Sequence, residues 1–145
     1  MLCTGSSYDA PVKNPSITDY DQRKKDWANT YDTIAQAQSV LIVGGGIVGT
    51  ELAAELACKY GEKKEKRIGM CVRGNKLLAG FDPRISEYAT QFLKGKGVDI
   101  NFNTPFIEGE TPKTLGYDLV FKCFGFQFRT DFLKQNFPQA LSPRG

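Results

Sequence analysis

The sequence of 145 residues contains no histidine and only four cysteines, one tryptophan and two methionines. Without histidine, the chain lacks the commonest general base and the commonest metal ligand. Cys3, Cys58, Cys71 and Cys123 form no C-x-x-C pair, so we expect neither a metal site nor a local redox disulfide. Reduced core thiols, and an N-terminus without a visible secretory signal, favour a reducing compartment such as the cytoplasm or a mitochondrion.

The sequence also lacks a strong charge of one sign and a long apolar run. Its net charge of +3 is too small to point to nucleic acid. The one stretch resembling a membrane span is VLIVGGGIVGTELAAELA, Val40 to Ala57. Three glycines interrupt it, and Glu51 and Glu55 are strongly disfavoured in a bilayer core. We therefore expect one soluble domain without a transmembrane segment, and nothing in the sequence fixes its oligomeric state.

Apolar periodicity and chain breakers predict alternating helices and strands. The helices are expected over 21–38, 48–60 and 83–95, the strands over 40–43, 68–72, 98–102 and 119–124, and a short helix over 130–135. Apolar residues recur at helical spacing in the first helix (Trp27, Tyr31, Ile34 and Ala35) and in the third (Ile85, Tyr88, Ala89, Phe92 and Leu93). This order predicts an α/β fold, a Rossmann-like βαβαβ domain of three layers with helices on both faces of a central parallel sheet. The sequence leaves open whether a short antiparallel segment is added to this parallel sheet.

The segment GGGIVG satisfies the pattern G-x-G-x-x-G between an expected strand and an expected helix. Gly44 would allow the tight turn, Gly46 would let a pyrophosphate approach the backbone, and Gly49 would bring the helix close to the strand. The helix N-terminus, from Gly45 through Ile47 and Val48, would offer free N–H groups and a partial positive charge to the phosphates. The alternative is a glycine-rich bend that holds no ligand.

Two other motifs in the same region are excluded. A kinase-type phosphate loop requires lysine where Thr50 stands. Tyr60 and Lys64 form a Y-x-x-x-K pair, but they follow the helix and fall at the end of the sheet opposite the glycine turn. We interpret that pair as a coincidence.

The residues after the second expected strand indicate which dinucleotide would bind. A site for NAD or FAD usually has a carboxylate there, which binds ribose hydroxyls. This chain has Arg73, with Lys76 close by, and a cation can pair with the 2′-phosphate of NADPH. The sequence therefore slightly favours NADPH over NADH. An exposed arginine without a ligand is the alternative.

Three segments occur together in the order SVLIVGGGIVGTELAAELA, VRGNKLLAGFDPRISEYATQFLKGKGVDI and YDLVFKCFGFQFRTDFL. In this order and spacing the chain resembles the NAD(P)H-binding domain of the FAD-dependent pyridine nucleotide-disulfide oxidoreductases. Within that superfamily it is most similar to the branch of apoptosis-inducing factor 2 and the NADH-dehydrogenase-like proteins. The resemblance runs from about Leu2 to the C-terminus.

The resemblance implies roles for particular positions. It assigns the pyrophosphate turn to Gly44, Gly46 and Gly49, and it places Glu51 near the nicotinamide; a favourable anion in the first helical turn is the other interpretation of Glu51. It places Phe124 and Gly125 on a loop near the dinucleotide, where the family has a small residue before glycine. Arg73 matches the position that is arginine in several NADPH-specific members, whereas the second arginine of those members is Ala79 here.

The resemblance also implies that much of the enzyme lies outside this sequence. Residues 1–20, with LCTG at Leu2 to Gly5, match the junction with a flavin domain, and residues 21–145 match the NAD(P)H-binding domain. The FAD-binding motifs of the family are missing, so we expect no tight FAD binding by this chain alone. The implied function is delivery of hydride from nicotinamide to a flavin on another domain, with no catalytic side chain supplied here. The alternatives are a non-catalytic module that binds or senses NAD(P)H, and a turn that holds the ADP part of FAD.

Overall fold

A computed structural model describes residues 5–7, 16–61, 65–107, 109–111, 114–125 and 127–141. The chain divides into two units, one of residues 28–124 and one of residues 1–27 together with 125–145. The expected junction segment Leu2 to Gly5 lies outside the described residues except for Gly5, and the expected boundary at residue 20 stays a prediction.

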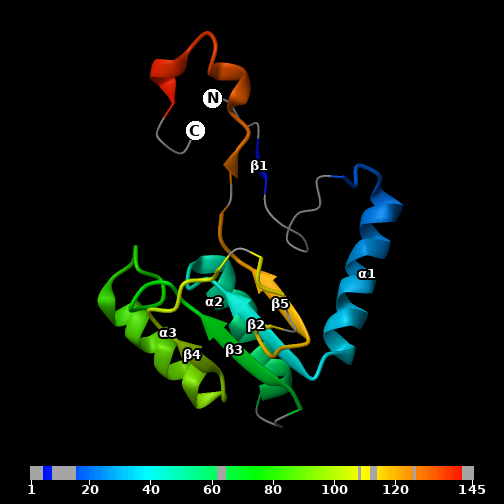
Figure 1. Cartoon of the computed structure of the whole chain (residues 1–145), viewed down its shortest axis with the longest axis vertical. Coiled ribbons are helices and arrows are strands. Elements are labelled where there is room, and N and C mark those ends of the chain that lie inside the picture. Colours follow the sequence, from blue (N-terminus) through cyan, green and yellow to red (C-terminus); the bar gives the residue numbers. More distant parts are fainter. Residues whose placement is uncertain are drawn as a thin grey trace. The chain divides into compact units, whose positions relative to one another are not determined.

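The larger unit is built on a four-stranded parallel sheet (Figure 1). Its strands are β2 (Ser39–Val43), β3 (Arg67–Cys71), β4 (Asp99–Asn101) and β5 (Leu119–Lys122), in the spatial order β4-β3-β2-β5. All five residues of β2 are buried, as expected of a central parallel strand covered on both faces. The Rossmann-like α/β fold expected from the sequence is confirmed.

One face of this sheet is covered by two helices. Helix α2 (Ile47–Leu56) follows β2 and continues as a π-helical turn, Ala57–Gly61, while α3 (Pro83–Gly95) connects β3 to β4. Buried residues of both helices, including Ala53, Leu56 and Leu93, pack with Ile42 and Met70 of the central strands. The carboxylate of Asp82 caps α3 by accepting the backbone N–H of Arg84 at 2.9 Å.

Helix α3 packs along only part of the apolar stripe expected from its sequence. Leu93 is buried, but Ile85 is 46% exposed and Tyr88 is 71% exposed, so for these two residues the expectation of packing is wrong. The inward face of the helix carries Ser86, which is 4% exposed, and Leu93, which is 1% exposed. These two residues lie seven apart on one side of the helix, and Ile85 and Tyr88 lie away from that side.

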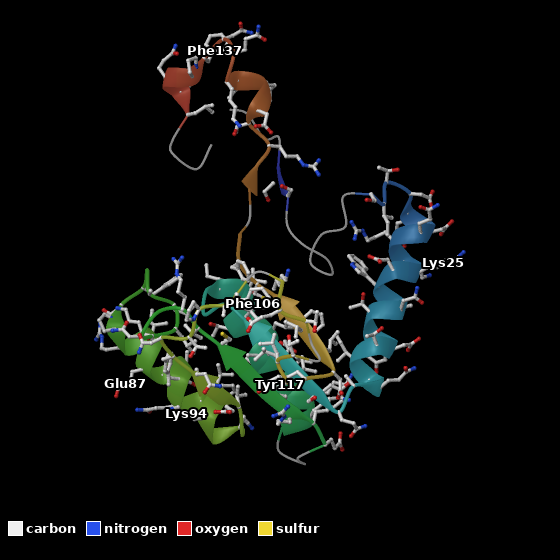
Figure 2. The ribbon with its side chains drawn as sticks, viewed as in Figure 1. Lys25, Glu87, Lys94, Phe106, Tyr117 and Phe137 are labelled. Atoms are coloured by element: carbon white, nitrogen blue, oxygen red, sulfur yellow. The ribbon has the colours of Figure 1, made fainter. Side chains whose placement is uncertain are left out.

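The other face of the sheet carries no helix among the described residues, so the expectation of helices on both faces is wrong. Its third layer is the connection between β4 and β5, which must cross the sheet because these strands occupy opposite edges. Three of its apolar side chains pack on Leu41, Val43 and Cys71; they are Phe106, Leu115 and Tyr117 (Phe106 and Tyr117 are labelled in Figure 2).

Tyr117 explains why β3 contains a glycine. A Cβ atom on Gly69 would come within 2.2 Å of the Tyr117 hydroxyl oxygen, so the ring lies directly on the strand backbone. The guanidinium of Arg67 stacks 4.0 Å from the centre of the ring. Burial raises the pKa of Tyr117. The missing side chain of Gly69 therefore makes room for the third layer.

Helix α1 (Tyr20–Gln36) precedes the sheet, and its apolar stripe does not form a packed face. Trp27 is 61% exposed and Tyr31 is 57% exposed, while only Ile34 packs partly on the core. The helix ends are satisfied by side chains: Asp19 accepts the N–H of Gln22 at 3.0 Å, and Lys66 donates to the carbonyl of Ala35 at 2.7 Å. Between the ends, Lys59 donates to the Tyr31 hydroxyl oxygen at 3.1 Å, so the helix is held by polar contacts as well as by the partial packing of Ile34.

The smaller unit contains an antiparallel pair of short strands, β1 (Ser6–Ser7) and β6 (Gln127–Phe128). The N–H of Arg129 extends the pairing to the carbonyl of Gly5 at 3.1 Å. The helix expected over 130–135 is a short 3₁₀ turn, Asp131–Leu133, and a second turn follows at Pro138–Ala140. Within the described residues, no helix combines the length and apolar character needed to cross a membrane.

Asp118 joins the beginnings of β2 and β5. Its carboxylate accepts the N–H of Ser39 at 2.8 Å, the Ser39 hydroxyl at 3.0 Å and the N–H of Gln38 at 2.9 Å. The N–H of Asp118 donates in return to the Ser39 hydroxyl oxygen at 3.0 Å. These bonds, first of all that from the Ser39 hydroxyl, hold the pKa of Asp118 below its usual value of 3.8.

Replacing Asp118 by asparagine should lower the melting temperature at pH 7, because a neutral amide oxygen is a weaker acceptor than a carboxylate. A lowered folded-state pKa stabilises the fold above the usual pKa, and this stabilisation is lost as the pH falls through the lowered value. The difference between the native chain and Asp118→Asn should thus be constant from about pH 7 to 5 and shrink below about pH 4. Circular dichroism melts measure it, with Asp32→Asn as control. An unchanged difference at pH 3 would contradict this account.

Candidate functional site

Two of the glycines between β2 and α2 are required by close backbone contacts. Gly44 has a φ of +121°, and a Cβ there would lie 2.7 Å from the carbonyl oxygen of Cys123. A Cβ on Gly49 would lie 2.1 Å from the carbonyl oxygen of Gly44. The turn is held to the sheet by the N–H of Gly44, which donates to the backbone carbonyl of Cys71 at 2.9 Å. Gly44 therefore permits the tight turn and Gly49 the close approach of the helix, as the sequence predicted, while their role as cofactor ligands stays a prediction.

The middle two glycines differ from each other. A Cβ on Gly45 would lie 2.7 Å from a methyl group of Val72 and 3.1 Å from one of Leu77, so Gly45 is also needed for packing. A Cβ on Gly46 would meet nothing within 4 Å, and the φ of −81° at Gly46 is open to any residue. No contact among the described residues therefore requires glycine at position 46, and the space above its backbone is open there.

The N-terminus of α2 begins at this open space. No side chain caps it, and the first hydrogen bond within the helix is donated by Thr50 to Gly46 at 3.0 Å. The N–H groups of Ile47, Val48 and Gly49 precede that bond and have no partner inside the helix. Together with the helix dipole they form a site suited to an anion.

Thr50 and Glu51 are adjacent polar residues near the start of α2. Glu51 is exposed and lies beyond the first helical turn, which contains no acidic residue. Its interpretation as a first-turn anion is therefore wrong, while its assignment to a dinucleotide site stays a prediction. The hydroxyl oxygen of Thr50 is buried without a hydrogen-bond partner among the described residues, and sequence reasoning used Thr50 only to exclude a kinase-type loop.

The loop after β3 is fastened to the glycine turn. Leu77 is fully buried, and Leu78 donates its N–H to the carbonyl of Gly45 at 2.7 Å, with an unusual φ of +48°. The start of the loop is held by the turn after β4, where the backbone N–H of Asn103 donates to the carbonyl of Gly74 at 2.9 Å. The loop that carries Arg73 and Lys76 is thus held at both ends.

Arg73 is exposed and Lys76 is half-buried, so both lie on the loop that the sequence predicted. Their role as ligands of a dinucleotide stays a prediction. Sequence reasoning missed Leu77 and Leu78 as anchors. Two consecutive leucines in a loop of mainly polar and small residues were the signal that could have found them.

The end of β5 lies against the same turn. The backbone N–H of Cys123 donates to the carbonyl of Val43 at 2.8 Å. Burial raises the pKa of the Cys123 thiol to about 11. Phe124 follows, 46% exposed, with its ring centre 5.8 Å from that of Phe106. Gly125, with a φ of +78°, belongs to the smaller unit, and its assignment to the site stays a prediction.

The glycine turn therefore lies where the strand order reverses, since β3 is on one side of β2 and β5 on the other. A crevice at the carboxyl ends of such strands, with a helix N-terminus at its centre, is the place where Rossmann-like folds bind dinucleotides. The fold and the turn define the chain as a member of the Rossmann-like class of α/β proteins.

Comparison with known proteins gives the family. The whole chain, residues 1–145, matches the pyridine nucleotide-disulphide oxidoreductases, and it belongs to that family. It is 31% identical to apoptosis-inducing factor 1 of Saccharomyces cerevisiae over 72% of this chain and 29% of the relative. It is 33% identical to apoptosis-inducing factor homolog A of Dictyostelium discoideum, over 71% of this chain and 26% of that protein. The chain thus spans less than a third of the length of these relatives.

Solved structures show the same fold. The water-forming NADH oxidase of Lactobacillus brevis, bound to NADH, matches with a TM-score of 0.67 and 22% identity, over 97% of this chain and 33% of the oxidase. An engineered NADPH oxidase derived from it, bound to NADPH, matches with a TM-score of 0.65 and 20% identity over the same shares.

The contrast between Gly49 and Gly46 gives a test of the turn. Gly49→Ala should lower the free energy of unfolding by about 3 kcal/mol, since its Cβ would overlap a backbone oxygen that cannot easily move. Gly46→Ala should change it by less than about 1 kcal/mol, because the added methyl group meets nothing. Urea titrations of both variants provide the comparison. Equal losses would show that the described turn geometry is wrong.

Proposed function

We propose that the larger unit binds NAD(P)H and presents its nicotinamide to a flavin held by a domain outside this sequence. The observation that carries the proposal is the open space at Gly46. The fold needs glycine at 44, 45 and 49 for its own packing but not at 46. A glycine there is explained when a pyrophosphate takes the space that a side chain would occupy.

The residues of the turn fit this role. The N–H groups at the start of α2 would bind the pyrophosphate, and the helix dipole would stabilise its negative charge. The bound nicotinamide would supply the hydride chemistry. The chain itself would bind and orient, and family membership together with the NADH-bound and NADPH-bound oxidases supports the proposal. The same site also fits a non-catalytic module that senses NAD(P)H.

We further propose a preference for NADPH over NADH. Arg73 and Lys76 supply two cations on an anchored loop, at the position where a carboxylate would select unphosphorylated ribose. The engineered oxidase bound to NADPH offers a parallel, because its substitutions remove one aspartate and introduce two arginines. Ala79 lies on the same loop and leaves this chain without a further cation there.

Titration with NADPH and NADH should show that NADPH binds at least as tightly, because the 2′-phosphate gains a charge-assisted pair with Arg73. Arg73→Glu should reverse the order, since a carboxylate repels the phosphate and accepts from ribose hydroxyls. Isothermal calorimetry measures both. NADH binding ten-fold tighter to the unaltered chain, a difference of about 1.4 kcal/mol, would show that the cofactor preference is wrong.

Gly46→Ala should weaken NADPH binding at least about ten-fold while leaving the stability of the chain nearly unchanged, because the methyl group takes the space proposed for the pyrophosphate. Gly95→Ala is the matched control, since a Cβ at the end of α3 also meets nothing within 4 Å. Fluorescence titration of the reduced nicotinamide gives the affinities. If Gly46→Ala bound NADPH as well as Gly95→Ala, the proposed site would be refuted.

A further inference from the structure

Strand β4 is an edge of the four-stranded sheet, and among the described residues it pairs with β3 alone. The carbonyl of Asn101 accepts the N–H of Val72 at 2.9 Å, so Asn101 directs its backbone groups toward the inside of the sheet. Consecutive residues of a strand direct these groups to opposite sides, so the N–H and C=O of Ile100 point to the free edge. Such an edge can pair with a further strand.

The free edge of β4 is suited to pairing with an identical strand. In an antiparallel pair centred on Ile100, the two Ile100 residues face each other and exchange both N–H···O bonds across a two-fold axis. Asp99 then lies opposite Asn101 of the second copy. No like charges directly oppose each other in this register, so the pairing carries no repulsion of that kind.

Helix α3 carries a second self-complementary feature. Glu87, Gln91 and Lys94 are exposed and follow one another at helical spacing, and the amide of Gln91 donates to the carboxylate of Glu87 at 3.2 Å. Glu87 and Lys94 project on the same outer side of α3, away from the other strands (Figure 2). Because their charges are opposite, an antiparallel second copy of α3 would bring Glu87 of each copy to Lys94 of the other.

The strand and the helix can share one two-fold axis. The N–H of Val98 donates to the carbonyl of Leu93 at 3.0 Å, which fixes the level of α3 relative to β4. Ile100 lies about 7 Å further along the strand, a distance that corresponds to about four to five residues back along α3. The midpoint between Glu87 and Lys94 lies within about 3 Å of that level. Both features therefore fit the same symmetric arrangement.

We propose that the free edge of β4 and the outer side of α3 form the surface through which two copies of this chain associate as a two-fold symmetric dimer. The two sheets join edge to edge at Ile100, and two ion pairs flank the junction. The strand has only 3 residues and the ion pairs are exposed, so the association is weak and depends on concentration. The inference is independent of the proposed function, because none of these residues belongs to the proposed dinucleotide site.

Exchanging the charges tests the surface, with sedimentation velocity of the whole chain over a series of concentrations. Glu87→Lys and Lys94→Glu should each weaken dimerisation about ten-fold, because like charges then meet at both ion pairs. An equal mixture of the two variants should recover it, since opposite charges meet again in the mixed dimer. Glu55→Lys makes the same charge change at an exposed position of α2, and as the control it should leave dimerisation unchanged.

Hydrogen exchange tests the strand pairing separately. The amide of Ile100 should exchange more slowly at high than at low concentration of the native chain, because it is hydrogen-bonded across the edge only in the dimer. Glu87→Lys should remove this dependence on concentration. An Ile100 amide that exchanges at the same rate at all concentrations would show that β4 does not pair with a second copy.

Two results of the sedimentation experiment would overturn the inference. One is a chain that stays monomeric up to about 0.3 mM. The other is a dimer that Glu87→Lys and Lys94→Glu leave unchanged, because another surface would then hold it. Recovery in the mixture supports the proposed surface, since two misfolded variants would not restore each other. Each result can be read whether or not the chain binds NADPH.

Discussion

The close approach of α2 to the sheet is the constraint on which the candidate site depends. A Cβ on Gly49 would lie 2.1 Å from the carbonyl of Gly44, and one on Gly44 would lie 2.7 Å from Cys123. Only glycine at both positions lets the helix begin directly at the carboxyl ends of β2 and β5. The first N–H groups of the helix, which have no partner inside it, are consequently placed where the strand order reverses. A local steric requirement thus positions the charge that an anion would meet.

Much of the larger unit could be predicted because local sequence controls it. Unalternating aliphatic residues indicate a buried central strand, Asp82 before Pro83 indicates where α3 begins, and the spacing of Gly44 and Gly49 indicates a tight turn with close packing. Each signal is read from neighbouring residues. The described elements agree with these expectations in type and order, although their ends shift by a few residues.

Several features that the sequence did not predict depend instead on contacts between residues far apart in the sequence. The periodicity of Trp27 and Tyr31 predicts a helix correctly but says nothing of what covers it, and both side chains are exposed. The third layer consists of an irregular connection whose Tyr117 needs the missing side chain of Gly69. Leu78 has an unusual backbone angle, and its N–H bonds to the carbonyl of Gly45, 33 residues earlier in the chain. No periodic pattern carries such information.

The chemical character of the site fits a binding role better than proton transfer. The chain has no histidine, and the thiol beside the turn, Cys123, has a pKa of about 11 and so stays protonated at neutral pH. Direct hydride transfer needs no protein acid or base, because the chemistry belongs to the cofactors and the protein supplies position and charge. Position comes from the glycine turn and the loop anchored by Leu77. In the proposed function, charge would come from the N-terminus of α2 and from Arg73, so the proposal asks of these residues only what their geometry can supply.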